Sequence, residues 1–105
     1  MGKEVTIEID HQLGTRNLEY GFFYPLNYGF IPNFISLDGK PIEAYLLGVG
    51  MPVEKFIGTV IAYIHRENGD DKMIIVPKEK NYSNNIIWSL IDFQEHCFQS
   101  YIVRK

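Results

Sequence analysis

Hydrophobic and polar positions alternate near the N-terminus. Apolar side chains at Val5, Ile7 and Ile9 are separated by polar ones, and this period of two predicts a strand with one buried face. Three longer segments rich in β-branched and aromatic residues are also predicted strands: residues 42–49, 57–65 and 72–76. The polar turn at residues 67–71 predicts that the last two of these strands pair as a hairpin.

The remaining segments predict shorter elements. Residues 20–24 are typical of a short aromatic strand, and the prolines and glycine of residues 25–32 indicate a loop. Ser83 is a candidate helix cap, because the apolar residues that follow it recur every three or four positions for about four turns. Residues 101–103 are typical of a returning strand. Several strands with one late helix predict a mainly β (α+β) fold, a small β-barrel that carries a helix.

Length, composition and charge narrow the class of protein. The 105 residues correspond to one domain, 1–105, and a chain this small gains stability from a homo-oligomer. The net charge of −3 and the absence of long basic clusters argue against nucleic-acid binding, since phosphate contacts need Lys and Arg. One cysteine, no signal-like N-terminus and no apolar stretch long enough for a bilayer indicate a reducing, cytoplasmic location without a membrane span.

Acidic residues gather in two turns. Asp38 and Glu43 flank one turn, and Glu67, Asp70 and Asp71 lie in the other. Hard cations such as Mg²⁺ prefer oxygen ligands, so two acidic turns at one end of a barrel could bind them. Turns also favour Asp for backbone reasons, and from composition alone simple solvated acids are the better explanation.

Phosphate-binding side chains are present as well. The hydroxyl groups of Tyr24 and Tyr28 can donate hydrogen bonds to phosphate, and Lys72 can bind it as a point charge. Taken singly, each has a simpler explanation, as a core aromatic or a surface lysine.

Three segments, taken together, carry a family resemblance. Residues 24–32, Tyr-Pro-Leu-Asn-Tyr-Gly-Phe-Ile-Pro, resemble the Tyr-Pro-x-Asn-Tyr-Gly-Tyr-Ile segment of soluble family I inorganic pyrophosphatases. Asp-Gly-Lys-Pro-Ile-Glu at residues 38–43 lies where that family has Asp-x-Asp-Pro-x-Asp. Residues 70–77 are similar to its Asp-x-Lys-x-x-x-Val-Pro strand, and Glu8 matches a strand glutamate. The agreement covers roughly residues 5–99, as in a short, divergent member.

The resemblance implies a five-stranded OB-like barrel that hydrolyses pyrophosphate to two phosphates with several Mg²⁺ ions, Mn²⁺ being an alternative. It also implies roles for residues at matching positions. Catalytic positions are Glu8, Tyr24, Asp38 and Lys40. Substrate-binding positions are Arg16, Tyr28 and Lys72. Metal positions are Asp38, Glu43, Glu67 and Asp70, with Glu67 standing in for an aspartate that aligns with His65.

The departures from the family pattern lead to alternatives. Lys40 replaces the second signature aspartate and Glu43 the third, so the formal charge of the three positions falls from −3 to −1. Two family lysines are absent, and Arg16 is the one candidate for the family arginine. A second hypothesis is therefore a non-catalytic protein that binds phosphate or another anion, in which Lys40 pairs with Asp38 and Glu43 in place of a metal. A third, less favoured because of the charge, is an OB-type module for single-stranded nucleic acid.

Overall fold

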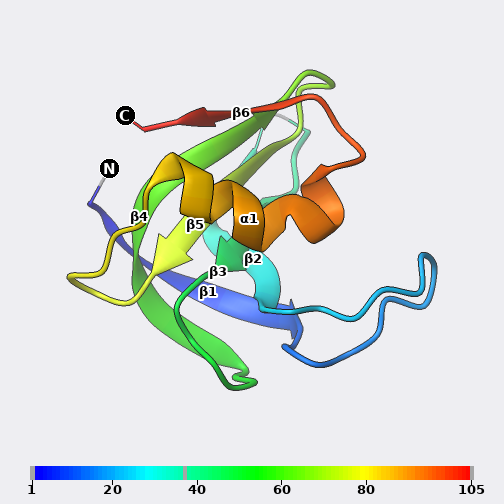
Figure 1. The fold of residues 1–105 in the computed structure, drawn as a ribbon. Coiled ribbons are helices and arrows are strands. Elements are labelled where there is room, and N and C mark those ends of the chain that lie inside the picture. The colour runs from blue at the N-terminus through cyan, green and yellow to red at the C-terminus, as the bar shows by residue number, and fades with distance from the viewer. Residues whose placement is uncertain (1, 37, 105) are drawn as a thin grey trace.

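The computed structural model describes residues 2–36 and 38–104, which form six strands and one helix (Figure 1). The elements in chain order are β1 (Glu4–His11), β2 (Asn27–Ile35), β3 (Pro41–Leu46), β4 (Lys55–Arg66), β5 (Asp71–Val76), α1 (Asn84–Glu95) and β6 (Ser100–Val103). The predicted strands near residues 5–9, 42–49, 57–65, 72–76 and 101–103 are confirmed, with small shifts at their ends.

Five of the strands close into a barrel. Their order is β1-β2-β3-β5-β4, and β1 pairs again with β4 to complete the ring. All of these pairs are antiparallel except β3 with β5. The long strand β4 pairs with two strands: its first residues pair with β1 and its last residues pair with β6. The expected mainly β fold, a five-stranded barrel with one C-terminal helix, is confirmed.

Alternation along the strands separates two hydrophobic clusters. One fills the barrel and includes Ile7, Ile31, Ile42, Ala44, Leu46, Val60, Met73 and Ile75. The other lies on the outer face beneath the helix and includes Tyr28, Tyr45, Leu47, Ala62, Ile64, Ile74, Val76, Ile87 and Ile91. Because successive side chains of a strand point to opposite faces, the polar residues that alternate with the barrel interior belong to this outer face.

The helix α1 covers the outer face of the barrel (Figure 1). Its predicted cap is confirmed: the Ser83 side chain accepts a hydrogen bond from the backbone N–H of Ile86 at 3.3 Å. Ile87 and Ile91, four residues apart, are buried against the sheet. The helix ends at Glu95, which is earlier than the pattern predicted. Across the described residues, no helix has both the length and the apolar character needed to span a bilayer.

Two expectations between residues 20 and 35 are wrong. Residues 20–24 form a turn and an irregular segment, where one isolated bridge joins Phe23 to Arg16. Most of the loop expected at residues 25–32 belongs instead to β2, which runs from Asn27 to Ile35. Pro32 is tolerated there because it lies within a register shift of the β2–β3 pair, between Ile31 and Ile35. The glycine and prolines that suggested a loop are therefore features of an irregular strand.

Candidate functional site

The candidate site is built on one row of cross-strand partners. Glu8 of β1 pairs with Phe30 of β2, Phe30 pairs with Glu43 of β3, and Glu43 pairs with Lys72 of β5. Residues in register on one face of a sheet lie side by side, so the fold aligns segments that are distant in sequence. Glu43 alternates with the interior residues Ile42 and Ala44, which places this row on the outer face.

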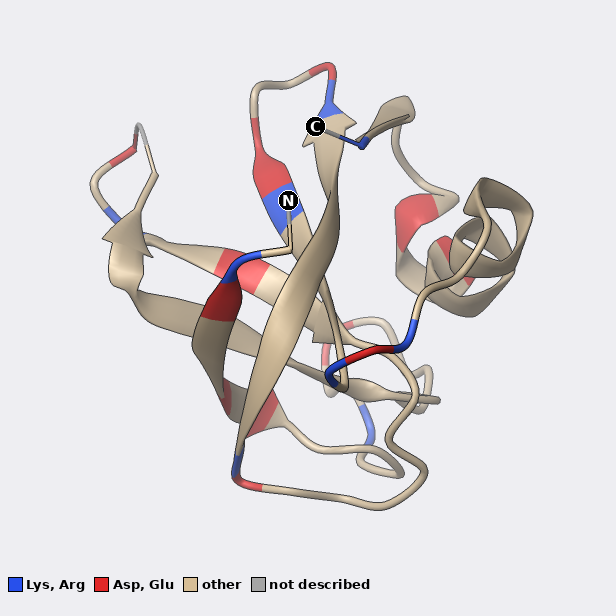
Figure 2. Cartoon of the chain, turned by 90° about the vertical axis from the view of Figure 1, so that its left-hand side faces the viewer, with Lys and Arg blue, Asp and Glu red and all other residues tan. Residues whose placement is uncertain are grey.

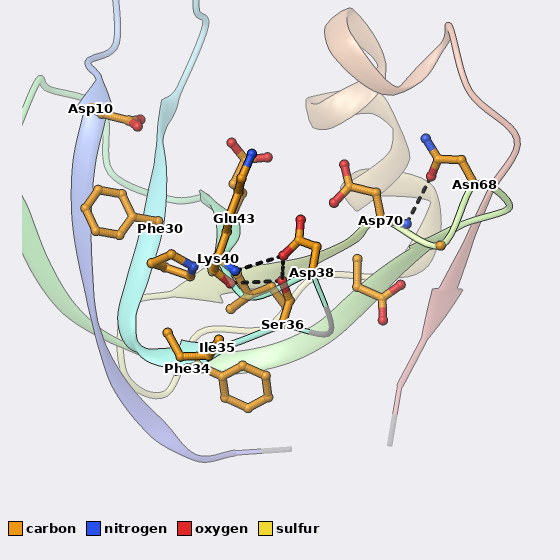
Figure 3. Close-up of a pocket in the computed structure, with 14 residues that line it drawn as sticks. Asp10, Phe30, Phe34, Ile35, Ser36, Asp38, Lys40, Glu43, Asn68 and Asp70 are labelled. Atoms are coloured by element: carbon orange, nitrogen blue, oxygen red, sulfur yellow. Dashed lines mark hydrogen bonds between the residues drawn. The ribbon is translucent and has the colours of Figure 1, made fainter.

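A cavity of about 780 Å³ lies at the end of this row. It is bordered by the turn before β3, the β4–β5 turn and the end of β1 (Figure 3). Acidic and basic positions lie close together along these turns and strand ends (Figure 2). The charged side chains that line the cavity are Asp10, Asp38, Lys40, Glu43, Asp70 and Asp71. The structure thus brings the predicted residues Asp38, Lys40, Glu43 and Asp70 together around one opening.

The buried side chain of Lys72 forms ion pairs with two of these acids, Glu43 and Asp70. Its ammonium Nζ lies 2.8 Å from Oε1 of Glu43 and 2.7 Å from Oδ2 of Asp70. The Lys72 side chain is 1% exposed, whereas the two carboxylates are about half exposed. A buried ammonium requires such partners, because an unpaired charge away from water is costly. In this structure the charge of Lys72 is directed to the acids, and its expected contact with phosphate remains a prediction.

The two predicted tyrosines have different surroundings. The Tyr28 hydroxyl donates to Oε1 of Glu43 at 3.0 Å, and burial, reinforced by the charge of Glu43, raises its pKa far above the usual value. Tyr24 is buried, stacks on His11 at 4.7 Å between ring centroids, and accepts a hydrogen bond from Nδ2 of Asn17 at 3.1 Å. Tyr28 therefore contacts an acid that lines the cavity, Glu43, whereas Tyr24 packs against His11 at the end of β1.

Asp38 is held by its own turn. Its Oδ1 accepts hydrogen bonds from the Ser36 hydroxyl at 2.5 Å and from the backbone N–H of Lys40 at 3.0 Å. The bond from Ser36, followed by that from Lys40, lowers the pKa of Asp38, so this exposed carboxylate stays ionised well into the acid range. Among the described residues the Lys40 side chain forms no ion pair with Asp38 or Glu43, and the cation that pairs with Glu43 is Lys72.

The donor chemistry fits a hard divalent cation, because carboxylate oxygens line the cavity. The predicted metal set is nevertheless not assembled. Among residues 2–36 and 38–104, no three His, Cys, Asp or Glu side chains come close enough to hold one ion. The physical reason is that Glu43 and Asp70 are already bonded to Lys72, and Asp70 also to Arg66. Asp38 lies on a separate turn.

Three predicted residues lie away from this cavity. Glu67 belongs to the β4–β5 turn but accepts a hydrogen bond from the Tyr101 hydroxyl of β6 at 2.9 Å. Glu8 and Arg16 line a second cavity of about 810 Å³ beside β1. Asp10 borders both cavities, so it lies between the two groups of predicted residues. Of the predicted residues, Asp38, Lys40, Glu43 and Asp70 thus line one cavity, and Glu8 and Arg16 line the other.

The sequence analysis missed Asp10 and Arg66, and it placed Asp71 in the second acidic turn without giving it a role in the site. Asp10 follows Glu8 by two positions on β1 and so shares its face, a signal that the strand period contained. Burial raises the pKa of Asp10, and Glu43 adds to the rise, while His11 opposes it. Asp71 lies 2.6 Å from Nδ1 of His65. Arg66, a buried cation that contacts Asp70, had no signal in the pattern of the sequence.

Comparison with known protein structures shows the same architecture. The chain matches an inorganic pyrophosphatase from Ehrlichia chaffeensis with a TM-score of 0.75 and 19% identity, over 93% of this chain and 83% of that one. An inorganic pyrophosphatase from Thermus thermophilus matches with a TM-score of 0.67 and 20% identity, over 95% of this chain and 80% of that one. At these identities the likeness establishes the fold.

Sequence comparison establishes the family. A protein named inorganic pyrophosphatase from Caulobacter vibrioides is 34% identical over 89 residues, covering 75% of this chain and 50% of the relative. Inorganic pyrophosphatase 2 of Pseudomonas syringae is 32% identical over 114 residues, covering 92% of this chain and 63% of the relative. The chain thus spans about half to two thirds of the length of these relatives. The sequence profile for inorganic pyrophosphatase matches residues 1–102, and this chain therefore belongs to the inorganic pyrophosphatase family.

Proposed function

We propose that this chain hydrolyses pyrophosphate to two phosphates in a Mg²⁺-dependent reaction at the cavity between β1, β3 and the β4–β5 turn. One observation carries the proposal. Asp38, Glu43 and Asp70, which come from the two acidic family segments, border the same cavity. Lys72 bonds to two of them from beneath. Family membership supports the reaction, since the relatives with 32–34% identity are named inorganic pyrophosphatases.

The acids of the cavity supply the metal ligands in this proposal. Asp38, Glu43 and Asp70 would each supply carboxylate ligands to one of several Mg²⁺ ions, or Mn²⁺ in their place, because no three of the described acids are close enough to share one ion and hard cations also take phosphate oxygens. A bound divalent ion lowers the pKa of its water and neutralises charge on phosphate. Asp38 suits this role because its low pKa keeps it ionised and its turn fixes its orientation.

The remaining predicted residues at the cavity would bind the substrate and set the local charge. Tyr28 keeps its proton at neutral pH, as an ordinary tyrosine does, and burial raises its pKa further. In this structure that proton is donated to Glu43, so the hydroxyl would turn from Glu43 to donate to a phosphate oxygen. Lys72 offsets part of the negative charge of Glu43 and Asp70, and in this proposal its ammonium group also contacts a phosphate oxygen. Lys40 at the rim adds a second positive charge and at the same time weakens metal binding by repulsion.

Cellular context belongs to the same proposal. A cytoplasmic location is consistent with a single, exposed cysteine. Assembly as a homo-oligomer is consistent with apolar side chains on the surface, among them Leu18, Tyr20 and Phe23 on the loop before β2.

The test is phosphate release from pyrophosphate by the purified chain, with Mg²⁺ and with a chelator. We expect release that needs the metal and that the substitution Asp38→Ala removes. Asp92→Ala is the matched control, because Asp92 lies on an exposed position of α1. Absence of release at high protein concentration would contradict the proposal. In that case, stabilisation of the chain by pyrophosphate without metal would instead support the anion-binding protein considered above.

A further inference from the structure

A buried ion pair outside the predicted site links the helix to the cavity. Arg66, the last residue of β4, bonds to Glu95, the last residue of α1, through two hydrogen bonds. Its Nε lies 3.0 Å from Oε1 and its Nη2 lies 2.5 Å from Oε2. The two side chains are 7% and 1% exposed. Neither side chain lines the cavity, among the residues that the structure describes.

The remaining face of the Arg66 guanidinium reaches the cavity. Its Nη1 donates to Oδ2 of Asp70 at 3.2 Å, the same oxygen that accepts from Lys72. A backbone hydrogen bond joins the same two residues, since the Arg66 N–H donates to the Asp70 carbonyl oxygen at 3.3 Å. Asp70 therefore sits between two buried cations that approach it from different strands.

Glu95 is itself fixed by three elements. It accepts hydrogen bonds from the hydroxyl groups of Tyr45 on β3 and Ser100 on β6, the latter at 2.9 Å. Gln94 donates to the Tyr45 hydroxyl at 2.8 Å. These bonds, with the charge of Arg66, lower the pKa of Glu95 although burial alone would raise it. Glu95 thus remains an anion with a defined position under Arg66.

The geometry of Arg66 leaves it little freedom. Two N–H groups bind Glu95 as a fork, and the guanidinium carbon lies 3.8 Å from the centroid of the Phe98 ring. A buried ion pair contributes little net stability compared with apolar residues of the same volume, so stability alone does not account for this arrangement. What the pair does provide is direction: it points one N–H of a rigid cation at one oxygen of Asp70.

We propose that Arg66, held in place by Glu95, is a positioning residue that fixes the Asp70 carboxylate at the cavity for the hydrolysis proposed above. The expected effect on kcat rests on the proposed function. The expected effect of Arg66 on the position of the Asp70 carboxylate does not require that the chain turns over pyrophosphate. Arg66 acts through Asp70 and does not itself line the cavity, among the residues that the structure describes.

The principal test variant is the double substitution Arg66→Met with Glu95→Gln. It removes both buried charges and keeps an acceptor for Tyr45 and Ser100, and methionine sulfur packs well on an aromatic ring such as Phe98. We expect a folded protein whose kcat falls by roughly 10- to 100-fold, with a smaller change in KM, as for a displaced active-site group. Tyr101→Phe is the control: it removes a hydrogen bond to Glu67 in the same turn without touching Asp70. It should leave kcat unchanged.

A double-mutant cycle shows whether Arg66 acts through Asp70. The combined change Arg66→Met with Glu95→Gln should lower kcat strongly in the wild-type chain and have little further effect when Asp70 is already replaced by Asn. Equal effects of the combined change in both backgrounds would overturn the proposal. An equal loss in Tyr101→Phe would overturn it too, because general loosening of the turn would then explain the data.

A crystal structure of the double variant tests the geometry without any ligand or turnover. We expect the Asp70 carboxylate to leave the position it occupies beside Lys72. An unmoved carboxylate would overturn the inference even if activity fell. If the wild-type chain releases no phosphate but Asp70 moves in the variant, the proposed function fails and the positioning role stands.

Discussion

Lys40 is the residue whose charge differs most from the family pattern. It lines the cavity, and its backbone N–H bonds to Asp38, so position 40 faces the site. A unit charge about 4 Å from another interacts by about 1 kcal/mol in water and by more near a protein surface. The lysine thus opposes metal binding at Asp38.

Replacement of Lys40 by Asp should therefore strengthen Mg²⁺ binding. We expect the affinity to rise by about 10-fold or more, since the charge changes by two units, and the rate of phosphate release to rise with it. Calorimetric titration with Mg²⁺ and a phosphate-release assay measure the two effects. Lys78→Asp, on the loop after β5, carries the same charge change away from the cavity and should alter neither. Unchanged binding and rate in Lys40→Asp would show that this position has no influence on the metal.

Among the elements, β2 shows how residues of the motif that resembles the family can act through the fold itself. Asn27 is fully buried and binds two loops: its Oδ1 accepts from the backbone N–H of Leu13 at 3.0 Å, and its Nδ2 donates to the Met51 carbonyl oxygen at 3.0 Å. Gly29 allows β1 to pass close by, because a Cβ at this position would lie 1.8 Å from the Glu8 carbonyl oxygen. These two residues set the distance between β1 and β2, and so the position of Glu8 and Asp10.

Gly29→Ala should destabilise the barrel at this contact. The added methyl group meets backbone atoms of β1, which cannot rotate away, so we expect a loss of about 3 kcal/mol in the free energy of unfolding. Urea unfolding followed by circular dichroism measures it. Gly50→Ala is the matched control, because open space surrounds a Cβ there and its φ is not in the left-handed region. A stability loss no larger than that of Gly50→Ala would mean that β1 can shift without cost.

The element pattern also separates what the sequence could predict from what it could not. Strand periodicity and the cap at Ser83 depend on neighbours in sequence, and those predictions were confirmed. The strand β2 was missed because Gly29 and Pro32 are loop signals locally, whereas their acceptability depends on β1 and on a register shift. The residues next to Gly29 and Pro32 in the sequence do not indicate that β1 passes close by or that the register of β2 against β3 shifts.

At the scale of the whole molecule, the gathering of Asp38, Glu43 and Asp70 could be predicted because the family motifs carry it. Their counter-ions could not. Arg66 and Glu95 are 29 positions apart on a strand and a helix, and neither belongs to a motif segment. Lys72 could be expected to bind phosphate, but its pairing with two acids depends on the register of β3 against β5. Which charges pair in this fold thus depends on the tertiary structure and not on the local sequence.

This pairing of charges should appear in the acid unfolding of the molecule. The pKa of Glu95 lies below its ordinary value of 4.5 in the folded chain, so folding favours the ionised form. The resulting stability is fully present above about pH 4.5 and is lost as the pH falls through the folded-state pKa. Glu95→Gln lacks this group and leaves Arg66 without its main partner. We expect the variant to be less stable than wild type by about 3 kcal/mol at pH 7.

The gap between the two proteins should narrow as the pH falls from about 4.5 through the folded-state pKa of Glu95. In this range the unfolded wild-type chain binds a proton before the folded chain does, and only below the folded-state pKa does the buried carboxyl group resemble the amide. Urea unfolding at intervals from pH 7 to pH 3 measures the gap directly. Glu79→Gln, on the exposed loop before α1, should follow wild type at every pH. A gap that stays constant across this range would mean that the loss in Glu95→Gln comes from packing and not from the charge. The link from α1 through Arg66 to the cavity would then be steric, and the charge of Glu95 would have no part in holding Asp70.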